Sequence, residues 1–394
     1  MSAVSGDGAA SARIAGLHYS IDDAPGFSRQ RRGRGFVYRA PSGQIVRSPA
    51  VLKRIRGLVL PPAWRDVWIS VDPLSHLQAT GRDAAGRKQY RYHPSWTAVR
   101  DSTKFHRLLS FAEALPRLRR RAAQDARKPK LSRDQVLATV VQILERTNIR
   151  VGNEEYVRAN GSHGLTTLRN RHVRVGPRRI RFLFRAKSGV MQKMDLLDAR
   201  LAAAVRACQE LPGQTLFQYV DGEESVRSIS SADVNGYLRE AAGDEFTAKD
   251  FRTWAGTLVA ASALDEIGAA ETKSAGAKSI VQAIDRVAEA LGNTRAVSRR
   301  CYIHPAVLTS YENGMTIGRV RERPRVAGLS RDEARLLALL RAAVRAERTA
   351  LRKALSGRPR PPRPSPRATA RGRRARPSGP WQPWGRPPPR EPSS

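Results

Sequence analysis

The chain has 394 residues, of which 40% are hydrophobic, so it is long enough for two or three domains with a substantial core. The 71 Lys and Arg residues outnumber the 35 Asp and Glu residues. The net charge of +36 predicts a polyanionic partner, with nucleic acid as the first candidate and an anionic membrane surface as the alternative. No apolar run approaches the roughly 20 residues of a membrane-spanning helix, and two cysteines exclude a disulfide framework.

The N-terminal part predicts a small β-rich domain over residues 17–97, preceded by a disordered segment over residues 1–16. Strands are expected from about Gly35 to His93. "GFVYRAPSGQIV" contains a turn, "VWISV" is a short apolar strand, and "HLQATGRDAAGRKQYRYH" has the pattern of two strands around a glycine-bearing loop. The first residues lack the basic and apolar regions of a signal peptide, which favours a cytoplasmic protein.

After Trp96 the apolar residues recur at helical spacing, so residues 98–325 are expected to form a larger, mainly α-helical domain. A β-hairpin interrupts it in "HVRVGPRRIRFLFRAKSG", where alternate side chains from Ile180 to Ala186 share one face. Later helices are expected in "AKDFRTWAGTLVAASALDEIG", behind a Thr247 cap, and in "KSIVQAIDRVAEALGN". The predicted fold class is therefore α+β.

The C-terminal part predicts one more helix and a tail. The helix is expected within residues 326–356, where Ser330 and Glu333 have the spacing of a capping box. Residues 357–394 contain ten Arg, one Glu, no Lys and twelve Pro, a net charge of +9. Such a segment cannot bury a core, so we expect a disordered basic tail that can also bind phosphate loosely.

Several kinds of site are missing from the sequence. There is no G-x-x-x-x-G-K-[ST] stretch for a nucleotide, the seven histidines are scattered without metal-ligand spacing, and no D-x-D pair offers a magnesium site. The sequence therefore predicts chemistry that uses neither ATP nor a bound metal and depends on side chains alone.

A tyrosine stands among arginines in "NTRAVSRRCYIHP", where Arg299 and Arg300 come just before Tyr302. Attack on a phosphodiester without a metal requires a nucleophile, cations around the non-bridging oxygens and a proton donor for the leaving oxygen. Arginine suits the second role because it stays protonated and its planar fork matches phosphate oxygens. Taken alone, this stretch favours a surface position for Tyr302 on a basic helix.

Four stretches that follow one another in a fixed order give this tyrosine its context: "ERTNIRVGNEEYVRANGSHGLTTLRNRHVRV", "FLFRAKSG", "KDFRTWAGT" and "LGNTRAVSRRCYIHP". Together they resemble the type IB DNA topoisomerases of the bacterial and poxvirus group. The N-terminal stretches "LHYSIDDAPGFSRQRRGRGFVY", "LPPAWRDVWIS" and "HLQATGRDAAGRKQYRYHPSW" also resemble that family. The resemblance covers residues 17–323 and leaves the tail unexplained.

The resemblance implies an active site and a set of DNA contacts. By motif, the family's catalytic residues fall on Arg150, Lys187 at a hairpin tip as general acid, Arg252, Asn293, and Tyr302 as nucleophile. Asn293 follows the bacterial pattern, because viral members have His at that place. The positions that the family uses against DNA fall on Gln89, Tyr90, Tyr92 and Tyr156. Strand alternation would place Gln89 and Tyr90 on opposite faces.

The resemblance also implies a function: a monomeric, nucleoid-associated enzyme that relaxes supercoiled double-stranded DNA without a cofactor. A tyrosine recombinase uses similar chemistry but exchanges strands between partner DNAs, and the N-terminal domain favours the topoisomerase. Charge and tail alone would also fit a non-catalytic DNA-compacting protein, which predicts no covalent adduct.

Overall fold

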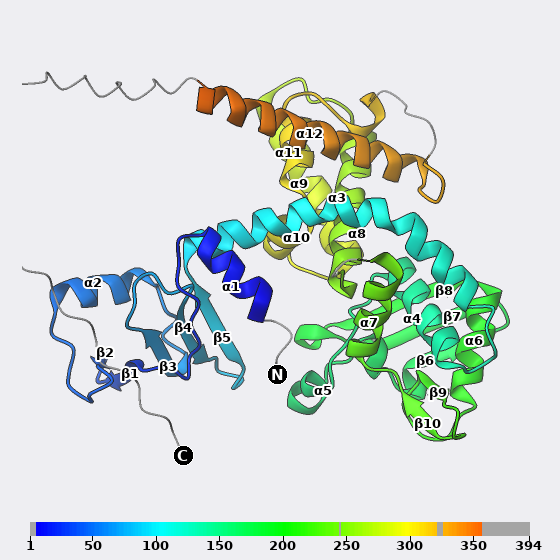
Figure 1. Cartoon of the computed structure of the whole chain (residues 1–394), viewed down its shortest axis with the longest axis horizontal. Coiled ribbons are helices and arrows are strands. Elements are labelled where there is room, and N and C mark those ends of the chain that lie inside the picture. The colour runs from blue at the N-terminus through cyan, green and yellow to red at the C-terminus, as the bar shows by residue number, and fades with distance from the viewer. Residues whose placement is uncertain (1–4, 244–245, 321–325, 357–394) are drawn as a thin grey trace, which may run out of the picture. The chain divides into compact units, whose positions relative to one another are not determined.

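The computed structural model describes residues 5–243, 246–320 and 326–356, with helices and strands numbered in chain order (Figure 1). The predicted α+β class is confirmed, because an antiparallel sheet in the N-terminal part is followed by a mainly helical remainder. The predicted tail over residues 357–394 lies outside the described residues. Within the part that is described, no helix has both the length and the hydrophobicity needed to cross a membrane.

The N-terminal sheet has five antiparallel strands in the order β2-β1-β3-β4-β5. The strands are β1 (Gly26–Arg32), β2 (Gly35–Arg39), β3 (Arg65–Ser70), β4 (Leu77–Arg82) and β5 (Lys88–Tyr92). The predicted strands at "VWISV" and in "HLQATGRDAAGRKQYRYH" are confirmed as β3 and the β4–β5 hairpin. The small core beneath the sheet contains Val67, Ile69 and Ala79.

Three elements of this region differ from the sequence prediction, and the first is strand β1, which precedes the expected start of the strands at Gly35. Helix α2 (Pro49–Gly57) lies inside the stretch that was expected to contain only strands, and it buries Ile55 against the sheet. It begins at Pro49, a residue type that suits the first turn of a helix. Helix α1 (Ser5–Ile14) occupies the segment that was expected to be disordered, so that prediction is wrong for these residues. Ala12 of α1 is fully buried in a small cluster with Leu17 and Trp96.

The larger, helical part begins with the 32-residue helix α3 (Pro94–Asp125) and continues through a three-stranded sheet, a two-stranded sheet and the helices between them. These elements are α4 (Arg133–Thr147), α5 (Glu154–Asn160), β6 (Val173–Val175), β7 (Arg179–Arg185), β8 (Met191–Leu197), α6 (Ala199–Gln209), β9 (Gln218–Val220), β10 (Val226–Ser228) and α7 (Ser231–Ala242). The predicted buried face is confirmed, since Ile180, Phe182 and Phe184 are at most 1% exposed. Strand β8 was not predicted, and it pairs with β7, so Lys187 lies in the β7–β8 turn.

Four helices follow: α8 (Ala248–Ile267), α9 (Lys273–Leu291), α10 (Arg295–Tyr302) and α11 (Pro305–Glu312). Helices α8, α9 and α10 pack against one another. The predicted start of α8 is confirmed, because the Asp250 carboxylate accepts hydrogen bonds at 2.9 Å from both the N–H and the hydroxyl of Thr247. The buried start of α8 and the ends of α9 and α10 thus come together in one region of the core.

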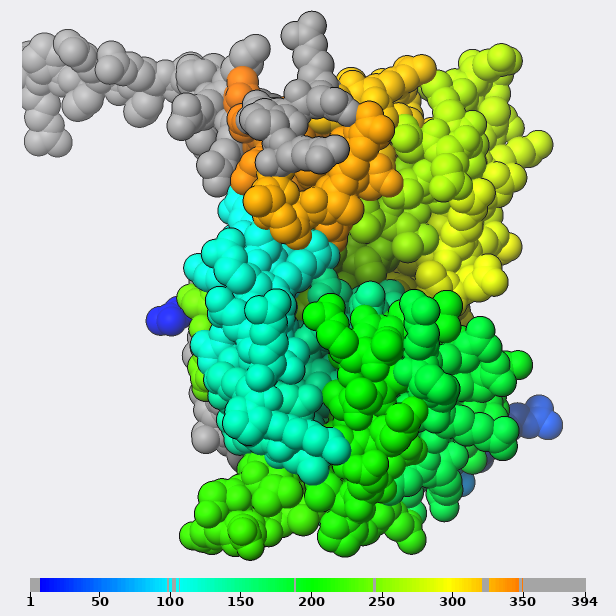
Figure 2. Space-filling model, turned by 90° about the vertical axis from the view of Figure 1, so that its right-hand side faces the viewer, coloured from blue at the N-terminus to red at the C-terminus, as the bar shows by residue number. Residues whose placement is uncertain are grey.

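Helix α12 (Arg331–Ser356) is fastened to α3 near its first turn, and Figure 2 shows orange residues of α12 beside the cyan of α3. The predicted capping box is confirmed, since the Ser330 N–H donates to the Glu333 carboxylate at 2.7 Å and the Glu333 N–H donates to Ser330 Oγ at 3.2 Å. The same carboxylate accepts from the guanidinium of Arg119 at 2.7 Å and from the indole of Trp254 at 3.1 Å. Burial alone would raise the pKa of Glu333, but these donors lower it to about 2.

Replacing Glu333 by Gln is expected to destabilise the protein at neutral pH. Because the pKa of Glu333 is about 2 in the folded state and ordinarily 4.5, its stabilising contribution is complete above pH 4.5 and is lost as the pH falls toward 2. The loss at pH 7 should be about 3 kcal/mol in the free energy of unfolding, measured by urea denaturation. Glu266→Gln is the control, because Glu266 pairs with Arg286 on the exposed surface and should cost less than about 1 kcal/mol. Equal losses for both variants would contradict this role of Glu333.

Candidate active site

Four of the five catalytic residues predicted from the sequence converge although they come from separate elements. Arg150 lies in the loop after α4, Arg252 in the second turn of α8, Asn293 just after α9, and Tyr302 is the last residue of α10. The fifth, Lys187, lies in the β7–β8 turn. The convergence depends on the packing of α8, α9 and α10 described above.

Asn293 is fixed by the end of helix α9. Gly292 has a left-handed backbone with φ of 58°, and the Asn293 N–H donates to the carbonyl of Ala288 at 2.9 Å. The side-chain oxygen of Asn293 accepts a hydrogen bond from the Arg150 guanidinium at 2.5 Å. The amide nitrogen Nδ2 is buried and has no hydrogen-bond partner among the described residues. It is therefore a free donor inside the protein.

Arg252 is only 3% exposed. Its guanidinium donates to the carbonyl of Asn148 and, at 2.7 Å, to that of Leu291, and its carbon lies 5.2 Å from the centroid of the Tyr302 ring. The Nε of Arg252 is buried and, in the described structure, has no partner. The carbonyls at the ends of α4 and α9 thus hold the Arg252 guanidinium beside the Tyr302 phenol, and the Nε–H of Arg252 remains available as a donor.

In the part of the chain that the structure describes, the guanidiniums of Arg150 and Arg252 have no negative counter-charge. Burial lowers the pKa of Arg252, and the nearby charge of Arg150 lowers it further, whereas Tyr302 partly opposes both effects. Burial also lowers the pKa of Arg150, again with Tyr302 opposing it. No Asp or Glu of the described residues stabilises either charge. A buried charge without a partner is costly, so this arrangement favours an anion that binds beside Tyr302.

The loop that carries Arg150 is held by a second loop that contains Gly164. The Leu165 N–H donates to the carbonyl of Arg150 at 2.8 Å. A Cβ atom at Gly164 would lie 2.5 Å from the backbone of Gly152 and 2.6 Å from the carbonyl oxygen of Arg150, so only glycine permits this approach. The His163 N–H also donates at 2.8 Å to the carbonyl of Arg185, two residues before Lys187. One segment therefore fastens both the Arg150 loop and the strand that leads to Lys187.

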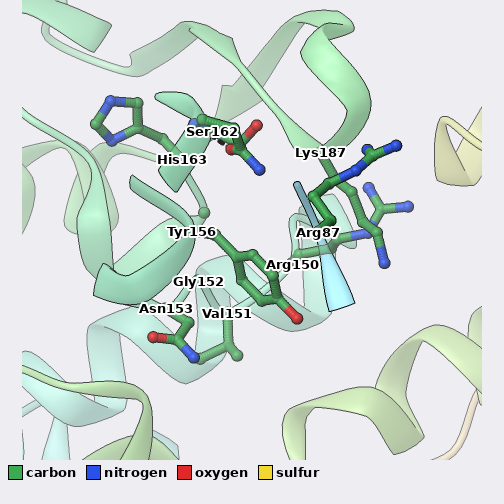
Figure 3. Close-up of a pocket in the computed structure, with 11 residues that line it drawn as sticks. Arg87, Arg150, Val151, Gly152, Asn153, Tyr156, Ser162, His163 and Lys187 are labelled. Atoms are coloured by element: carbon green, nitrogen blue, oxygen red, sulfur yellow. Dashed lines mark hydrogen bonds between the residues drawn. The ribbon is translucent and has the colours of Figure 1, made fainter. Parts of the chain in front are cut away.

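Lys187 and Tyr156 line a pocket of about 250 Å³ together with Arg150 (Figure 3). Lys187 is exposed, and no hydrogen bond joins it to the other four predicted catalytic residues. Its hairpin nevertheless lies beside the site, because the side chain of Gln192 on β8 packs against Gly292, the residue before Asn293. A Cβ atom added at Gly292 would lie only 2.8 Å from the side-chain nitrogen of Gln192. Tyr156, on α5, is 56% exposed, so its hydroxyl is accessible from this pocket.

The remaining predicted contact residues lie on the edge strand β5. Tyr90 and Tyr92 are exposed by 49% and 41%, and their rings stack with centroids 6.0 Å apart. Gln89 is half-buried and donates to the carboxylate of Asp83 at 2.9 Å. The tyrosines therefore share one face, and the side chain of Gln89 is engaged within its own hairpin.

Two further groups of the site were missed by the sequence analysis. The carbonyl of Asn148 receives the Arg252 guanidinium, and the hydroxyl of Thr257 contacts the backbone of Tyr302. A backbone carbonyl has no sequence signal at all, and a threonine inside a helix looks like any other packing residue. Only the three-dimensional arrangement reveals them.

The chain is similar to known proteins along most of its length. The family model described as "Eukaryotic DNA topoisomerase I, catalytic core" matches residues 93–322, more than half of the chain, and that described as "Bacterial DNA topoisomerase IB, N-terminal domain" matches residues 35–83. The chain is 33% identical over 295 residues to the DNA topoisomerase 1B of Acanthamoeba polyphaga mimivirus. The matched region covers 73% of this chain and 88% of that protein. The chain therefore belongs to the type IB DNA topoisomerases, isomerases that act on DNA.

Proposed function

We propose that this enzyme relaxes supercoiled DNA through a covalent link between Tyr302 and one DNA strand. The phenolic oxygen of Tyr302 gives its proton to water and attacks a phosphodiester in line. A bond forms between this oxygen and phosphorus, and the bond from phosphorus to the 5′-oxygen breaks. The products are a 3′-phosphotyrosyl link and a strand that ends in a 5′-hydroxyl. After the nicked duplex has rotated, the 5′-hydroxyl attacks the phosphotyrosine, releases Tyr302 and restores the strand.

The observation that carries this proposal is the unpaired positive charge beside the phenol. Arg252 is 3% exposed and has no carboxylate partner among the described residues. Within the same part of the chain, its Nε and the Nδ2 of Asn293 are buried donors without acceptors. A phosphodiester supplies what these groups lack, namely a negative charge and two non-bridging oxygens. Arg150, Arg252 and Asn293 would stabilise those oxygens as charge increases in the transition state.

Lys187 is proposed as the general acid that protonates the departing 5′-oxygen. An exposed ammonium in a short turn, at the rim of a pocket that Arg150 also lines, can approach a bound strand when the loop moves. The pocket face of Tyr156 and the paired rings of Tyr90 and Tyr92 are proposed contacts for the DNA backbone and thymine methyl groups. Gln89 could read a base edge only after leaving Asp83.

The energy of the broken bond is kept in the phosphotyrosine, so relaxation needs no ATP, and the guanidiniums supply the charge that a metal would otherwise provide. We propose that a monomer acts on double-stranded DNA and removes supercoils of either sign. In the cell this activity would place the enzyme at the nucleoid.

The test is to incubate the enzyme with supercoiled plasmid in EDTA, without ATP. Both positively and negatively supercoiled plasmids should relax, and protein trapped with detergent should be attached to 3′ DNA ends. Relaxation that requires ATP or a divalent cation would contradict the proposal. Plasmid multimers in place of relaxed circles would indicate strand exchange between partner DNAs, as in a recombinase.

Asn293→Ala should slow cleavage less than Arg150→Ala or Arg252→Ala. The amide of Asn293 donates a neutral hydrogen bond, whereas each guanidinium also adds charge, and losing one such stabilising group costs on the order of 10²–10³ in rate. Single-turnover cleavage at saturating DNA would measure the three defects. Equal defects would show that Asn293 does more than donate a hydrogen bond to the phosphate. Its side-chain oxygen accepts a 2.5 Å hydrogen bond from Arg150, so Asn293 would then also hold Arg150 in place.

A further inference from the structure

The backbone at the end of helix α10 is held by one side chain of helix α8. A helix leaves its last carbonyl groups without partners inside the helix, and Tyr302 is the last residue of α10. The carbonyl of Tyr302 lies 3.2 Å from the hydroxyl of Thr257, and the N–H of His304 lies 3.1 Å from the same oxygen. Thr257 therefore contacts the chain on both sides of Ile303.

The roles in these hydrogen bonds follow from the chemistry of a hydroxyl. A backbone N–H can only donate, so the Thr257 oxygen is the acceptor for His304. The single hydroxyl hydrogen is shared between the carbonyl of Thr253 at 2.7 Å and that of Tyr302 at 3.2 Å. Thr257 is 0% exposed, so water cannot replace the hydroxyl if it is removed. The hydrogen bond from the His304 N–H to this oxygen would then be lost.

Gly256, the residue before Thr257, explains how the backbones of α8 and α10 come so close. A Cβ atom at Gly256 would lie 2.7 Å from the carbonyl oxygen of Tyr302 and 3.0 Å from its Cβ. Any larger residue must therefore displace the end of α10 or the turn of α8 that faces it. Gly256 makes room for the backbone of Tyr302, and Thr257 binds it there.

Helix α8 also carries Arg252, whose guanidinium carbon lies 5.2 Å from the centroid of the Tyr302 ring. One rigid helix thus contacts the aromatic ring through Arg252 and the backbone through Thr257. We propose that Thr257 is a positioning residue, which fixes the backbone of Tyr302 relative to Arg252 so that the phenolic oxygen meets a phosphorus held by that arginine. This inference rests on the proposed role of Tyr302 as the nucleophile.

The effect on the rate should be large because in-line attack depends strongly on distance and angle. A displacement of about 1 Å, caused by a change away from the reacting atoms, can cost on the order of 10² in rate. The hydrogen bond of Thr257 goes to the backbone of the reacting residue. Its loss should therefore slow the chemical step and leave the affinity for DNA unchanged.

The experiment compares Thr257→Val, which keeps the shape and loses the hydroxyl, with Thr257→Ser, which keeps the hydroxyl. Thr139→Val is the matched control, because Thr139 is 1% exposed and its hydroxyl donates at 2.9 Å to the carbonyl of Gln135, four residues earlier in α4. Single-turnover cleavage at saturating DNA is measured on a duplex that the wild-type enzyme cuts, together with the dissociation constant for DNA and the melting temperature.

We expect Thr257→Val to cleave about 10- to 100-fold more slowly than wild type with an unchanged dissociation constant, and Thr257→Ser to restore most of the rate. Thr139→Val should keep the wild-type rate, whatever its melting temperature. Cleavage by Thr257→Val at the rate of Thr139→Val would overturn the proposal. Equal losses for Val and Ser would also overturn it, since the hydroxyl would then not be the group that matters.

Gly256→Ala keeps the proposal testable if Thr257→Val does not fold, because the added methyl group must move the backbone of Tyr302 while every hydroxyl remains. It should slow cleavage as well, and a wild-type rate would count against positioning by this part of α8. A failure of the underlying function looks different. In that case Tyr302→Phe would still form a covalent adduct, whereas a failure of the positioning role alone leaves Tyr302→Phe inactive and Thr257→Val fully active.

Discussion

Tyr302→Phe is expected to abolish relaxation and covalent attachment while leaving DNA binding nearly intact. The substitution removes one oxygen atom and keeps the ring that faces the Arg252 guanidinium at 5.2 Å, so the helices around it need not repack. Loss of a covalent nucleophile lowers the rate by a factor on the order of 10⁴ or more. Plasmid relaxation, detergent-trapped adducts and the dissociation constant for DNA would be measured side by side.

Tyr311→Phe provides the control for this substitution. Tyr311 lies nine residues further along in α11, is 4% exposed, and donates its hydroxyl to the carbonyl of Gly268 at 2.8 Å. Its loss should lower stability and leave the rate of relaxation per folded molecule unchanged. A covalent link to a 3′ DNA end in the Tyr302→Phe protein would mean that another residue attacks the phosphodiester.

The sequence was sufficient to predict those helices and strands whose own residues have a strong local pattern. The alternation from Ile180 to Ala186 predicted the buried face of β7, and the spacing of Ser330 and Glu333 predicted the start of α12. Elements with weak local patterns were missed. Strand β1 is mostly arginine and other polar residues, so its sequence shows no apolar alternation, and it is a strand because β2 and β3 pair with it on either side.

Helix α1 was missed for a related reason. Its sequence, SGDGAASARI, contains two glycines and little apolar surface, which disfavours an isolated helix. What holds it is the burial of Ala12 with Leu17 and Trp96, a contact between residues more than 80 positions apart. Tertiary packing of this kind cannot be inferred from one segment at a time.

For the candidate site, the family resemblance predicted which residues are catalytic, and the structure explains why these residues lie close together. Motifs in a fixed order selected Arg150, Arg252, Asn293 and Tyr302, and these four do come together. The motifs gave no indication that Asn293 and Arg150 are hydrogen-bonded, or that Arg252 is buried with no carboxylate beside it among the described residues. These properties depend on which helix ends meet in the core, and they are the physical basis of the proposed reaction.

Lys187→Ala should cut ordinary DNA about 10²- to 10⁴-fold more slowly than wild type, the range expected for loss of a general acid. The departing 5′-oxygen would leave as a strongly basic alkoxide unless it receives a proton. A 5′-bridging sulfur leaves as a thiolate, whose conjugate thiol has a pKa of about 8.5, and it needs little help from a proton donor. The variant should therefore cut the sulfur-substituted strand at nearly the wild-type rate.

Two matched variants make this result specific to the leaving group. Arg252→Ala should stay slow on both strands, because its guanidinium acts on the non-bridging oxygens, which the sulfur leaves unchanged. Lys193→Ala removes an exposed lysine from β8 of the same hairpin and should cut both strands at the wild-type rate. If sulfur restores nothing to Lys187→Ala, the ammonium instead holds a phosphate. The proton would then have to come from a different group, and the pocket that Lys187 lines with Arg150 and Tyr156 is the first place to search for it.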